Sequence, residues 1–286
     1  MFADNIKVSR CQSATHRTIC AALLLVAGSA RAAGHSLEVR VSDGTALFAQ
    51  TVPLELGRDH KFAGTVTGLK NALRRHMIFN TFMIASRSQP GAFSLQYELE
   101  LANGRVPEFQ GQGLLGVLPG TEVTVIECGA WTVEFRLDAA TAQGKKGTRP
   151  ANRAGLGNYL LTAEVVRGSA AHRCRQVSEL NTQNYVRAVY GKDNSFFLNS
   201  QLVASRRAGI LDLQYQLAHA APGTGPLQID PPNPLALTLG RQTTAAGPGY
   251  RLTLLVQSAA PDAESGHPSA ETNESPIYMK KVPLLR

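Results

Sequence analysis

Two segments of the chain repeat nearly the same residues, and this repetition constrains the fold more than any other feature. The first segment reads NTFMIASRSQPGAFSLQYELEL (80–101), and the second reads NSQLVASRRAGILDLQYQLAH (199–219). With a one-residue gap opposite Pro90, the identical aligned pairs are Asn80/Asn199, Ala85/Ala204, Ser86/Ser205, Arg87/Arg206, Gly91/Gly209, Leu95/Leu213, Gln96/Gln214, Tyr97/Tyr215 and Leu99/Leu217. A repeat of this kind predicts a duplicated structural unit.

The similarity continues downstream. LPGTEVTVIECGAWTVEFRLD (118–138) parallels TLGRQTTAAGPGYRLTLLVQS (238–258), which aligns Gly120 with Gly240 and Trp131 with Tyr250. We therefore predict one unit over residues 33–139 and a second over residues 158–258. The Gly-, Lys- and Arg-rich residues 140–157 between them are typical of a linker.

The period of the apolar residues predicts the type of unit. FSLQYELEL (93–101), LDLQYQL (211–217), WTVEFRL (131–137) and LEVRV (37–41) alternate apolar and polar residues, as half-buried strands do. Residues 68–78 and 179–189 are the best candidates for helices, and neither has a strong apolar stripe. The prediction is an all-β chain of two tandem antiparallel β-sandwich domains, in which Trp131 packs in a core.

The N-terminal residues predict export. Lys7, Arg10 and Arg17 precede a short apolar run that ends in small residues, which is the pattern of a secretory signal peptide over residues 1–32. The run is too short for a stable transmembrane anchor. We therefore expect a secreted protein, periplasmic or extracellular, with no transmembrane anchor in the mature chain.

The net charge limits the classes of partner. Removing residues 1–32 takes away four cationic residues and one acidic residue, which lowers the formal net charge from +8 to +5. The remaining charge is compatible with an anionic envelope polymer as a partner. No dense Lys/Arg block with interleaved aromatic residues is present, so nucleic acid is not an expected partner.

The mature chain retains two cysteines, Cys128 and Cys174. In an oxidising compartment an isolated pair favours a disulfide, which would here join the two repeats. A metal site and a catalytic thiol are the alternatives, and the only histidine close to either cysteine in sequence is His172.

No catalytic motif is recognisable. The chain has no G-x-S-x-G elbow, no P-loop, no H-E-x-x-H and no calcium-loop spacing, so we expect neither an enzyme nor a cofactor. The alternative is a copper-binding or carbohydrate-active secreted protein. Cleavage after Gly34 would place His35 at the N-terminus, where its amine and imidazole could ligate copper, with His172 or His76 as a second ligand.

The C-terminal residues 259–286 begin with a Pro-, Ser-, Ala- and Glu-rich stretch that is typical of a disordered tail, and they end in the apolar segment IYMKKVPLLR (277–286). The predicted function is a non-catalytic binding or assembly protein of the cell envelope that accepts or donates a strand at a sheet edge. The candidate partner surface comprises Arg87, Arg206, Ile277, Tyr278, Val282 and Leu284.

Overall fold

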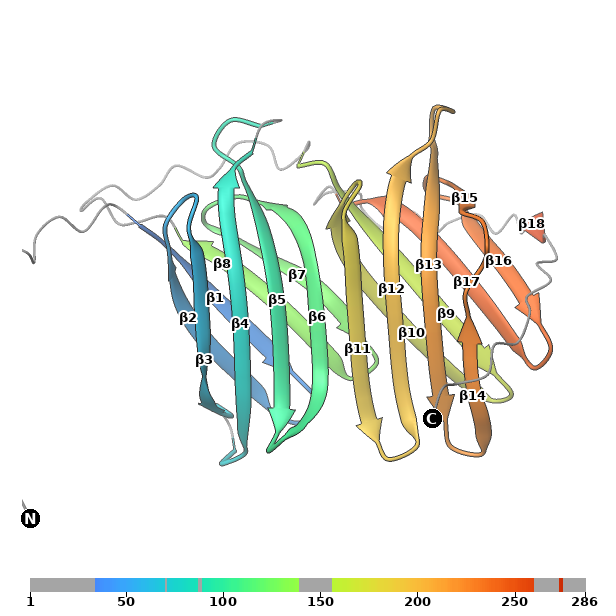
Figure 1. The fold of residues 1–286 in the computed structure, drawn as a ribbon, viewed down its shortest axis with the longest axis horizontal. Helices are drawn as coiled ribbons and strands as arrows, with labels where there is room; N and C mark the ends of the chain where they lie inside the picture. Colours follow the sequence, from blue (N-terminus) through green and yellow to red (C-terminus); the bar gives the residue numbers. More distant parts are fainter. Residues whose placement is uncertain (1–33, 70, 87–88, 139–155, 260–272, 275–286) are drawn as a thin grey trace, which may run out of the picture.

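The computed structural model of the chain describes residues 34–69, 71–86, 89–138, 156–259 and 273–274. These residues form strands and connecting turns without a helix, and the strands make two sheets of nine strands each. Figure 1 shows the two sheets as layers, one in front of the other, and we call them the front sheet and the rear sheet. Within the described residues no helix could cross a membrane.

The rear sheet has the strand order β18-β16-β17-β9-β10-β7-β8-β1-β2. Its strands are β1 (His35–Ser42), β2 (Leu47–Leu54), β7 (Thr121–Cys128), β8 (Trp131–Asp138), β9 (Asn158–Arg167), β10 (Ala170–Glu179), β16 (Gln242–Gly247), β17 (Tyr250–Ser258) and β18 (Asn273–Glu274). All neighbours are antiparallel except the short pair β16 and β18.

The front sheet has the order β14-β13-β12-β11-β6-β5-β4-β3, and β15 pairs with another part of β13. Its strands are β3 (Asp59–Thr67), β4 (Arg74–Ala85), β5 (Phe93–Asn103), β6 (Val106–Val117), β11 (Gln183–Gly191), β12 (Asn194–Ala204), β13 (Ile210–Ala221), β14 (Thr224–Ile229) and β15 (Leu235–Thr238). Every pair in this sheet is antiparallel.

The predicted strands are confirmed, because the period-two segments fall on β1, β5, β8 and β13. Along β5, the side chains of Leu95, Tyr97 and Leu99 are buried while Gln96 and Glu98 are exposed. One face of the strand therefore lies against the other sheet and the opposite face is open to solvent.

Neither helix candidate is helical. Residues 68–78 form a turn and the start of β4, and residues 179–189 form the end of β10, a turn and most of β11. Neither segment carries an apolar stripe of helical period, so pairing with neighbouring strands decides its conformation.

One hydrophobic core lies between the two sheets. The ring of Phe135 on β8 contacts Phe79 on β4 and Tyr97 on β5, with ring centroids 5.7 and 5.0 Å apart. Trp131 is buried and packs against Phe109 at 5.2 Å, which confirms its predicted core position. These aromatic contacts, edge-to-face at Phe135 and tilted at Trp131, join the front and rear sheets in the half formed by β1–β8.

The strands of the two halves follow the same spatial order. In the rear sheet, β2-β1-β8-β7 is followed by β10-β9-β17-β16, and in the front sheet β3-β4-β5-β6 is followed by β11-β12-β13-β14. We call β1–β8 the N-terminal half and β9–β17 the C-terminal half. Each strand of one half has a counterpart at the corresponding place in the other half, with β14 and β15 together in the place of β6.

Turn hydrogen bonds also recur at corresponding places in the two halves, most of them between residues that the sequence alignment pairs. Five pairs of backbone bonds correspond: Gly57 N to Met83 O with Asn181 N to Leu202 O, Ser86 N to Ala92 O with Ser205 N to Ile210 O, Ala92 N to Gln89 O with Ile210 N to Arg207 O, Gly120 N to Leu137 O with Gly240 N to Val256 O, and Thr121 N to Leu118 O with Arg241 N to Thr238 O. The first bond of each half begins at a residue with positive φ, 72° at Gly57 and 61° at Asn181.

Both sheets continue across the boundary between the halves. In the rear sheet β7 pairs with β10, and in the front sheet β6 pairs with β11. The two halves are therefore joined edge to edge within each sheet. The predicted linker, residues 140–157, lies almost wholly outside the described residues.

Candidate functional site

The outer face of the front sheet carries a row of polar side chains that crosses both halves. Each residue in the row is the direct cross-strand partner of the next: Lys61, Asn80, Glu98, Gln112, Tyr185, Asn199 and Gln216. Side chains at directly opposed positions lie about 5 Å apart, so the row forms a ladder over seven strands. Parallel to it run two shorter sets, Phe82–Gln96–Leu114 and Gln183–Gln201–Gln214.

A groove opens on this face where the halves meet. The pairing of β6 with β11 extends to Gln112 and Tyr185. The groove lies beyond this pair and has a volume of about 760 Å³. Its lining residues are Asp59, Asn80, Thr81, Phe82, Gln96, Tyr97, Glu98, Gln112, Gly113, Leu114, Asn181, Thr182 and Gln183. We call it the junction groove.

A second groove of about 440 Å³ adjoins the first and shares Gln183 with it. Its other lining residues are Asn199, Ser200, Gln201, Gln214, Tyr215, Gln216, Asp230, Pro231, Pro232, Asn233 and Pro234. Together the two grooves extend along the polar rows from β4 in the N-terminal half to β13 in the C-terminal half.

Several side-chain amides in these grooves are held in place by neighbours. Asn80 donates to Glu98 at 2.9 Å, and Gln183 donates to Asn199 Oδ1 at 3.0 Å. The amides of Gln96, Gln112 and Gln214, in contrast, make no hydrogen bond to another described residue. These grooves therefore combine amides that neighbouring side chains hold in place with amides that make no hydrogen bond to another described residue.

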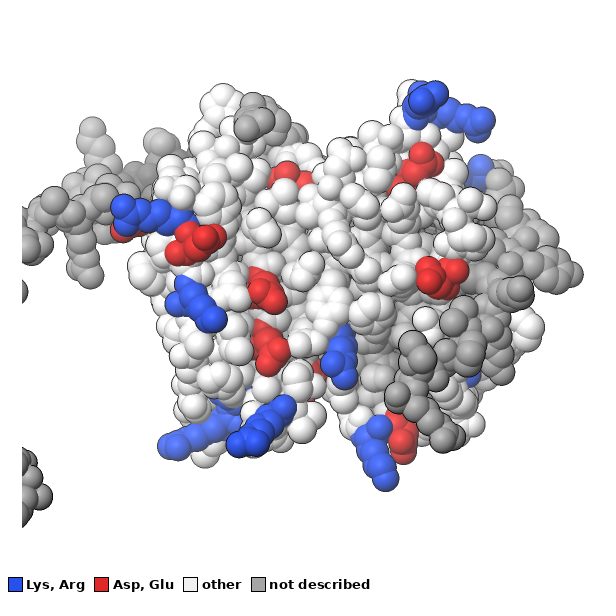
Figure 2. Space-filling view, in the orientation of Figure 1, with Lys and Arg blue, Asp and Glu red and all other residues white. Residues whose placement is uncertain are grey.

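The front face is poor in charge. Figure 2 shows that most of its described surface is uncharged and that Lys and Arg do not gather into a dense patch there. The carboxylates that line the grooves are Asp59, Glu98 and Asp230, with no Lys or Arg among the lining residues. The grooves therefore offer no favourable field to an anionic polymer.

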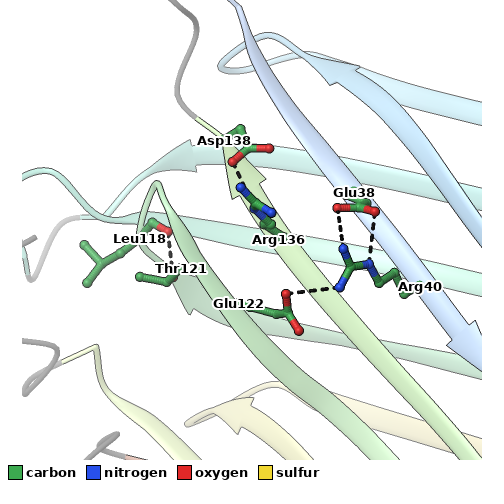
Figure 3. A network of polar contacts seen from close by, with 7 residues as sticks. All are labelled: Glu38, Arg40, Leu118, Thr121, Glu122, Arg136 and Asp138. Carbon is green, nitrogen blue, oxygen red and sulfur yellow. Dashed lines mark hydrogen bonds and ion pairs between the residues drawn. The ribbon is translucent and has the colours of Figure 1, made fainter. Parts of the chain in front are cut away.

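On the outer face of the rear sheet, several charges of β1, β7 and β8 are paired with one another. Arg40 on β1 makes two hydrogen bonds to Glu38, at 3.0 and 3.1 Å, and a third to Glu122 on β7 at 3.2 Å. Arg136 and Asp138 on β8 form a further pair at 3.2 Å, as Figure 3 shows. These partly exposed ion pairs leave the charges of this region largely neutralised.

The structure places the two cysteines among the described residues opposite each other. Cys128 on β7 and Cys174 on β10 are direct cross-strand partners at the boundary between the halves, and both are buried. Their thiols are free in this structure, so the predicted disulfide is not formed here although its two residues are brought together. Burial, followed by the hydrogen bond with Cys128, raises the pKa of the Cys174 thiol well above its usual value.

A histidine adjoins this thiol pair. His172 Nε2 lies 3.8 Å from Cys128 Sγ and 3.1 Å from the Tyr190 hydroxyl, and the ring stacks on Phe196 with centroids 4.6 Å apart. Burial and, secondarily, the neighbouring His219 lower the pKa of His172 to about 4. The Tyr190 hydroxyl also donates to the Cys128 carbonyl oxygen, so this aromatic cluster fixes β10 and β11 against β7.

Two strand edges remain at the N-terminal end of the paired sheets. Among the described strands, β2 pairs only with β1 and β3 pairs only with β4. In the strand order, β2 and β3 hold the positions in the N-terminal half that β10 and β11 hold in the C-terminal half. There, β10 pairs with β7 and β11 pairs with β6, so those two edges are covered. The edge at the C-terminal end differs in both sheets. In the front sheet, residues 230–234 (DPPNP) separate β14 from β15, and in the rear sheet β16 is paired with β18.

Exposed apolar side chains flank the N-terminal edge. Of the six exposed large apolar residues among those described, Leu56, Leu69, Leu73 and Ile84 lie in the β2–β3 turn, the β3–β4 turn and the end of β4. Leu69 is the most exposed, at 64%. These side chains flank β3 at both of its ends and do not form one contiguous patch.

The remaining predicted site residues are placed as follows. Arg206 is exposed in the β12–β13 turn and forms no ion pair with a described residue, whereas Arg87, Ile277, Tyr278, Val282 and Leu284 lie outside the described residues. His35 begins β1, and its ring contacts Phe93 edge-on at 4.6 Å. No group of three or more His, Cys, Asp or Glu side chains that could hold a metal is found among the described residues, and copper at His35 stays a prediction.

The sequence interpretation missed the amide rows, although a signal for them was present. Gln96 and Gln214 are identical in the repeat and point to solvent, as do Asn80 and Asn199. Identical residues on the outer face of a strand are not required by packing, and this pattern indicates a shared surface. No protein-family model matches the chain, and neither a curated protein nor a solved structure matches it.

Proposed function

We propose that this chain is an exported, non-catalytic binding and assembly protein of the cell envelope, built from two copies of one β-sandwich unit. In this proposal its open β2–β3 edge receives a strand from a partner protein. The observation that carries the proposal is the equivalence of two edges. The β10–β11 edge is covered by strands of the N-terminal half, and the corresponding β2–β3 edge has no covering strand among those described.

The duplication is supported by agreement at two levels. The strand order of one half repeats in the other, and the turn hydrogen bonds recur at residues that the sequence alignment pairs, as with Met83 and Leu202. Local sequence similarity alone would not require the same bonds and the same spatial order.

Strand addition is supported by the chemistry of the edge. Strand β3 spans nine residues without a proline, whereas β2 contains Pro53, so β3 is the edge strand that can form a continuous ladder with an added strand. The flanking Leu56 and Leu69 provide apolar contacts beyond the ladder. The Lys61 side chain is the charged group in the middle of the strand, and a single cation limits edge pairing less than a proline does.

A protein partner is favoured over an anionic polymer. An anionic polymer needs a concentrated positive surface, and the grooves of the front face contain three carboxylates and no cation. The predicted apolar segment 277–286, from this or another copy, remains one candidate for the added strand.

Site-specific photo-crosslinking of the full chain in its native envelope tests the proposal. A crosslinker at Thr65, which is exposed on β3, should label one defined protein, identified by mass spectrometry of the crosslinked peptide. The double variant Ala63→Lys/Lys61→Glu with the crosslinker retained should lose this product, because it changes the charge pattern along the edge. A crosslinker at Gln257, exposed on the interior strand β17, is the matched control.

The same labelling pattern at both positions, or the absence of a product at Thr65, would refute the proposed edge. Deletion of residues 277–286 separates the two sources of the added strand. If the crosslinked peptide maps to these residues, the deletion abolishes the product, and if it maps to another protein through another segment, the product persists.

A further inference from the structure

Strand addition at the edge does not involve the polar rows or the two grooves of the front sheet. We propose that the junction groove and its neighbour form one binding site for a neutral carbohydrate chain. This inference concerns the outer face of the front sheet, whereas the proposed assembly function concerns the edge of both sheets, so each can fail without the other.

The chemistry of the lining residues favours sugar hydroxyls. A sugar hydroxyl both donates and accepts hydrogen bonds, and a carboxamide side chain offers a carbonyl acceptor beside two N–H donors. Gln96, Gln112 and Gln214 present such groups without a partner among the described residues. A ligand that supplied donors and acceptors alternately would satisfy these amides, whereas an apolar ligand would leave them unpaired.

Some groups in the grooves are already oriented for a ligand. The Asn80 amide is held by Glu98, and the Gln183 amide is held by Asn199, so their free lone pairs and N–H groups point in fixed directions. Orientation before binding lowers the entropy lost when a ligand is bound. The half-buried Phe82 ring supplies an apolar surface in the junction groove, suited to the C–H face of a pyranose ring.

The charges determine that the carbohydrate is neutral. Asp59 and Glu98 line the junction groove and Asp230 lines its neighbour, while no Lys or Arg lines either. A uronic acid or a sulfated sugar would be repelled by these carboxylates. The hydroxyls of a neutral sugar can donate to them, and such charge-assisted bonds are stronger than neutral ones.

The shape determines that the ligand is a chain rather than a monosaccharide. Both grooves share Gln183, and the row from Asn80 to Gln216 crosses six strands, or about 24 Å at the usual strand spacing. Because the sheet continues across the boundary between the halves, the row is held in one register over this length. A ligand that fills both grooves must span several sugar residues.

Isothermal titration calorimetry of the full mature chain tests the site. The probes are cellohexaose, maltohexaose and chitohexaose as neutral chains, the corresponding trisaccharides as short chains, and oligogalacturonate as an anionic chain. We expect saturable binding of at least one neutral hexasaccharide, at least tenfold weaker binding of its trisaccharide, and no binding of oligogalacturonate.

Variants place the binding on the front face. Gln96→Ala/Gln112→Ala should weaken hexasaccharide binding at least tenfold while the thermal unfolding midpoint stays unchanged, because both side chains are exposed or half-buried and neither contributes a side-chain hydrogen bond to the fold. The matched control is Thr132→Ala/Glu134→Ala on the outer face of the rear sheet, which should bind as the wild type does.

Three results would overturn the inference. The first is the absence of saturable binding to every neutral hexasaccharide at 5 mM ligand, which corresponds to a few kcal/mol of binding free energy at most. The second is tighter binding of oligogalacturonate than of the neutral chains. The third is equal affinity of the front-face variant and the wild type for the hexasaccharide. Each result is independent of crosslinking at Thr65, so the edge proposal is tested separately.

Discussion

The side chain of Asn158 on β9 forms two hydrogen bonds with the backbone of Gly116 on β6. Its Oδ1 accepts from the Gly116 N–H at 2.7 Å, and its Nδ2 donates to the Gly116 carbonyl oxygen at 2.8 Å. This pair is buried and connects the rear sheet of the C-terminal half to the front sheet of the N-terminal half. A side chain at position 116 would come within 2.9 Å of the Leu156 carbonyl oxygen, so glycine permits the close approach.

Replacing this asparagine should destabilise the whole chain. In Asn158→Ala the buried N–H and C=O of Gly116 lose their partners, and we expect the free energy of unfolding to fall by about 2–4 kcal/mol. Urea unfolding measures this change, and Gln257→Ala on an exposed position of β17 should change it by less than about 0.5 kcal/mol. Equal stabilities of the two variants would contradict a structural role for the Asn158–Gly116 pair.

Oxidation should join Cys128 to Cys174. Direct antiparallel partners have Cα atoms about 4.5–5.5 Å apart, which lies within the range of disulfides. The bond would close a loop between these residues and stabilise the protein by about 4 kcal/mol if it is unstrained. Intact mass and urea unfolding of the oxidised and reduced protein check both points.

The reduced thiols should react slowly in the folded state. Both are buried and the pKa of Cys174 is raised, so little thiolate is present at neutral pH. Alkylation with iodoacetamide should proceed at least tenfold faster in urea than in buffer. Equal rates would show that the cluster around Cys128 is open to solvent.

Stability should decrease on acidification because of His172. Its pKa in the folded state is about 4, below the value of about 6.5 in the unfolded chain, so the unfolded chain binds more protons between these values. The contribution of neutral His172 is complete above pH 6.5 and is lost as pH falls towards 4, with a loss of about 1–2 kcal/mol at pH 5.

The variant His172→Phe isolates this effect, because a phenyl ring can stack on Phe196 without taking up a proton. Its free energy of unfolding should depend on pH less steeply than that of the wild type between pH 7 and 5. Parallel profiles for the two proteins would assign the pH dependence to other groups.

Gly57 and Asn181 should respond alike to a β-branched substitution. Both have positive φ and donate to the aligned residues Met83 and Leu202, so valine at either position is strained. We expect Gly57→Val and Asn181→Val each to cost about 1–2 kcal/mol in thermal or urea unfolding. Asn181→Gly should be tolerated, since glycine adopts this conformation without a steric penalty. A neutral effect of Gly57→Val would argue against equivalent turns.

The strands could be predicted from sequence because their period is local. Leu95, Tyr97 and Leu99 alternate with polar residues, and this pattern is sufficient to identify β5 and the face that it buries. The repeat likewise predicts that β13 resembles β5. The first inference requires only residues that are close together in the chain, and the second requires only a comparison of two sequence segments.

The continuity of the sheets could not be predicted in the same way. The pairing of β6 with β11 depends on which edges meet, and no local pattern records that Gln112 lies opposite Tyr185. The free amides of Gln96 and Gln214 could be found from their identity in the repeat, but their position beside the grooves depends on this long-range register.

The difference between the two ends of the paired sheets has a consequence for how many units such a protein can contain. Terminal units of stacked repeats commonly carry features that stop further stacking. Here Pro231, Pro232 and Pro234 interrupt the outermost front strand at the C-terminal end, whereas β3 at the other end is unbroken. Under the proposed duplication, these prolines would interrupt the front-sheet pairing of a further copy at the C-terminal end, whereas the unbroken β3 would allow the front sheet to continue at the other end.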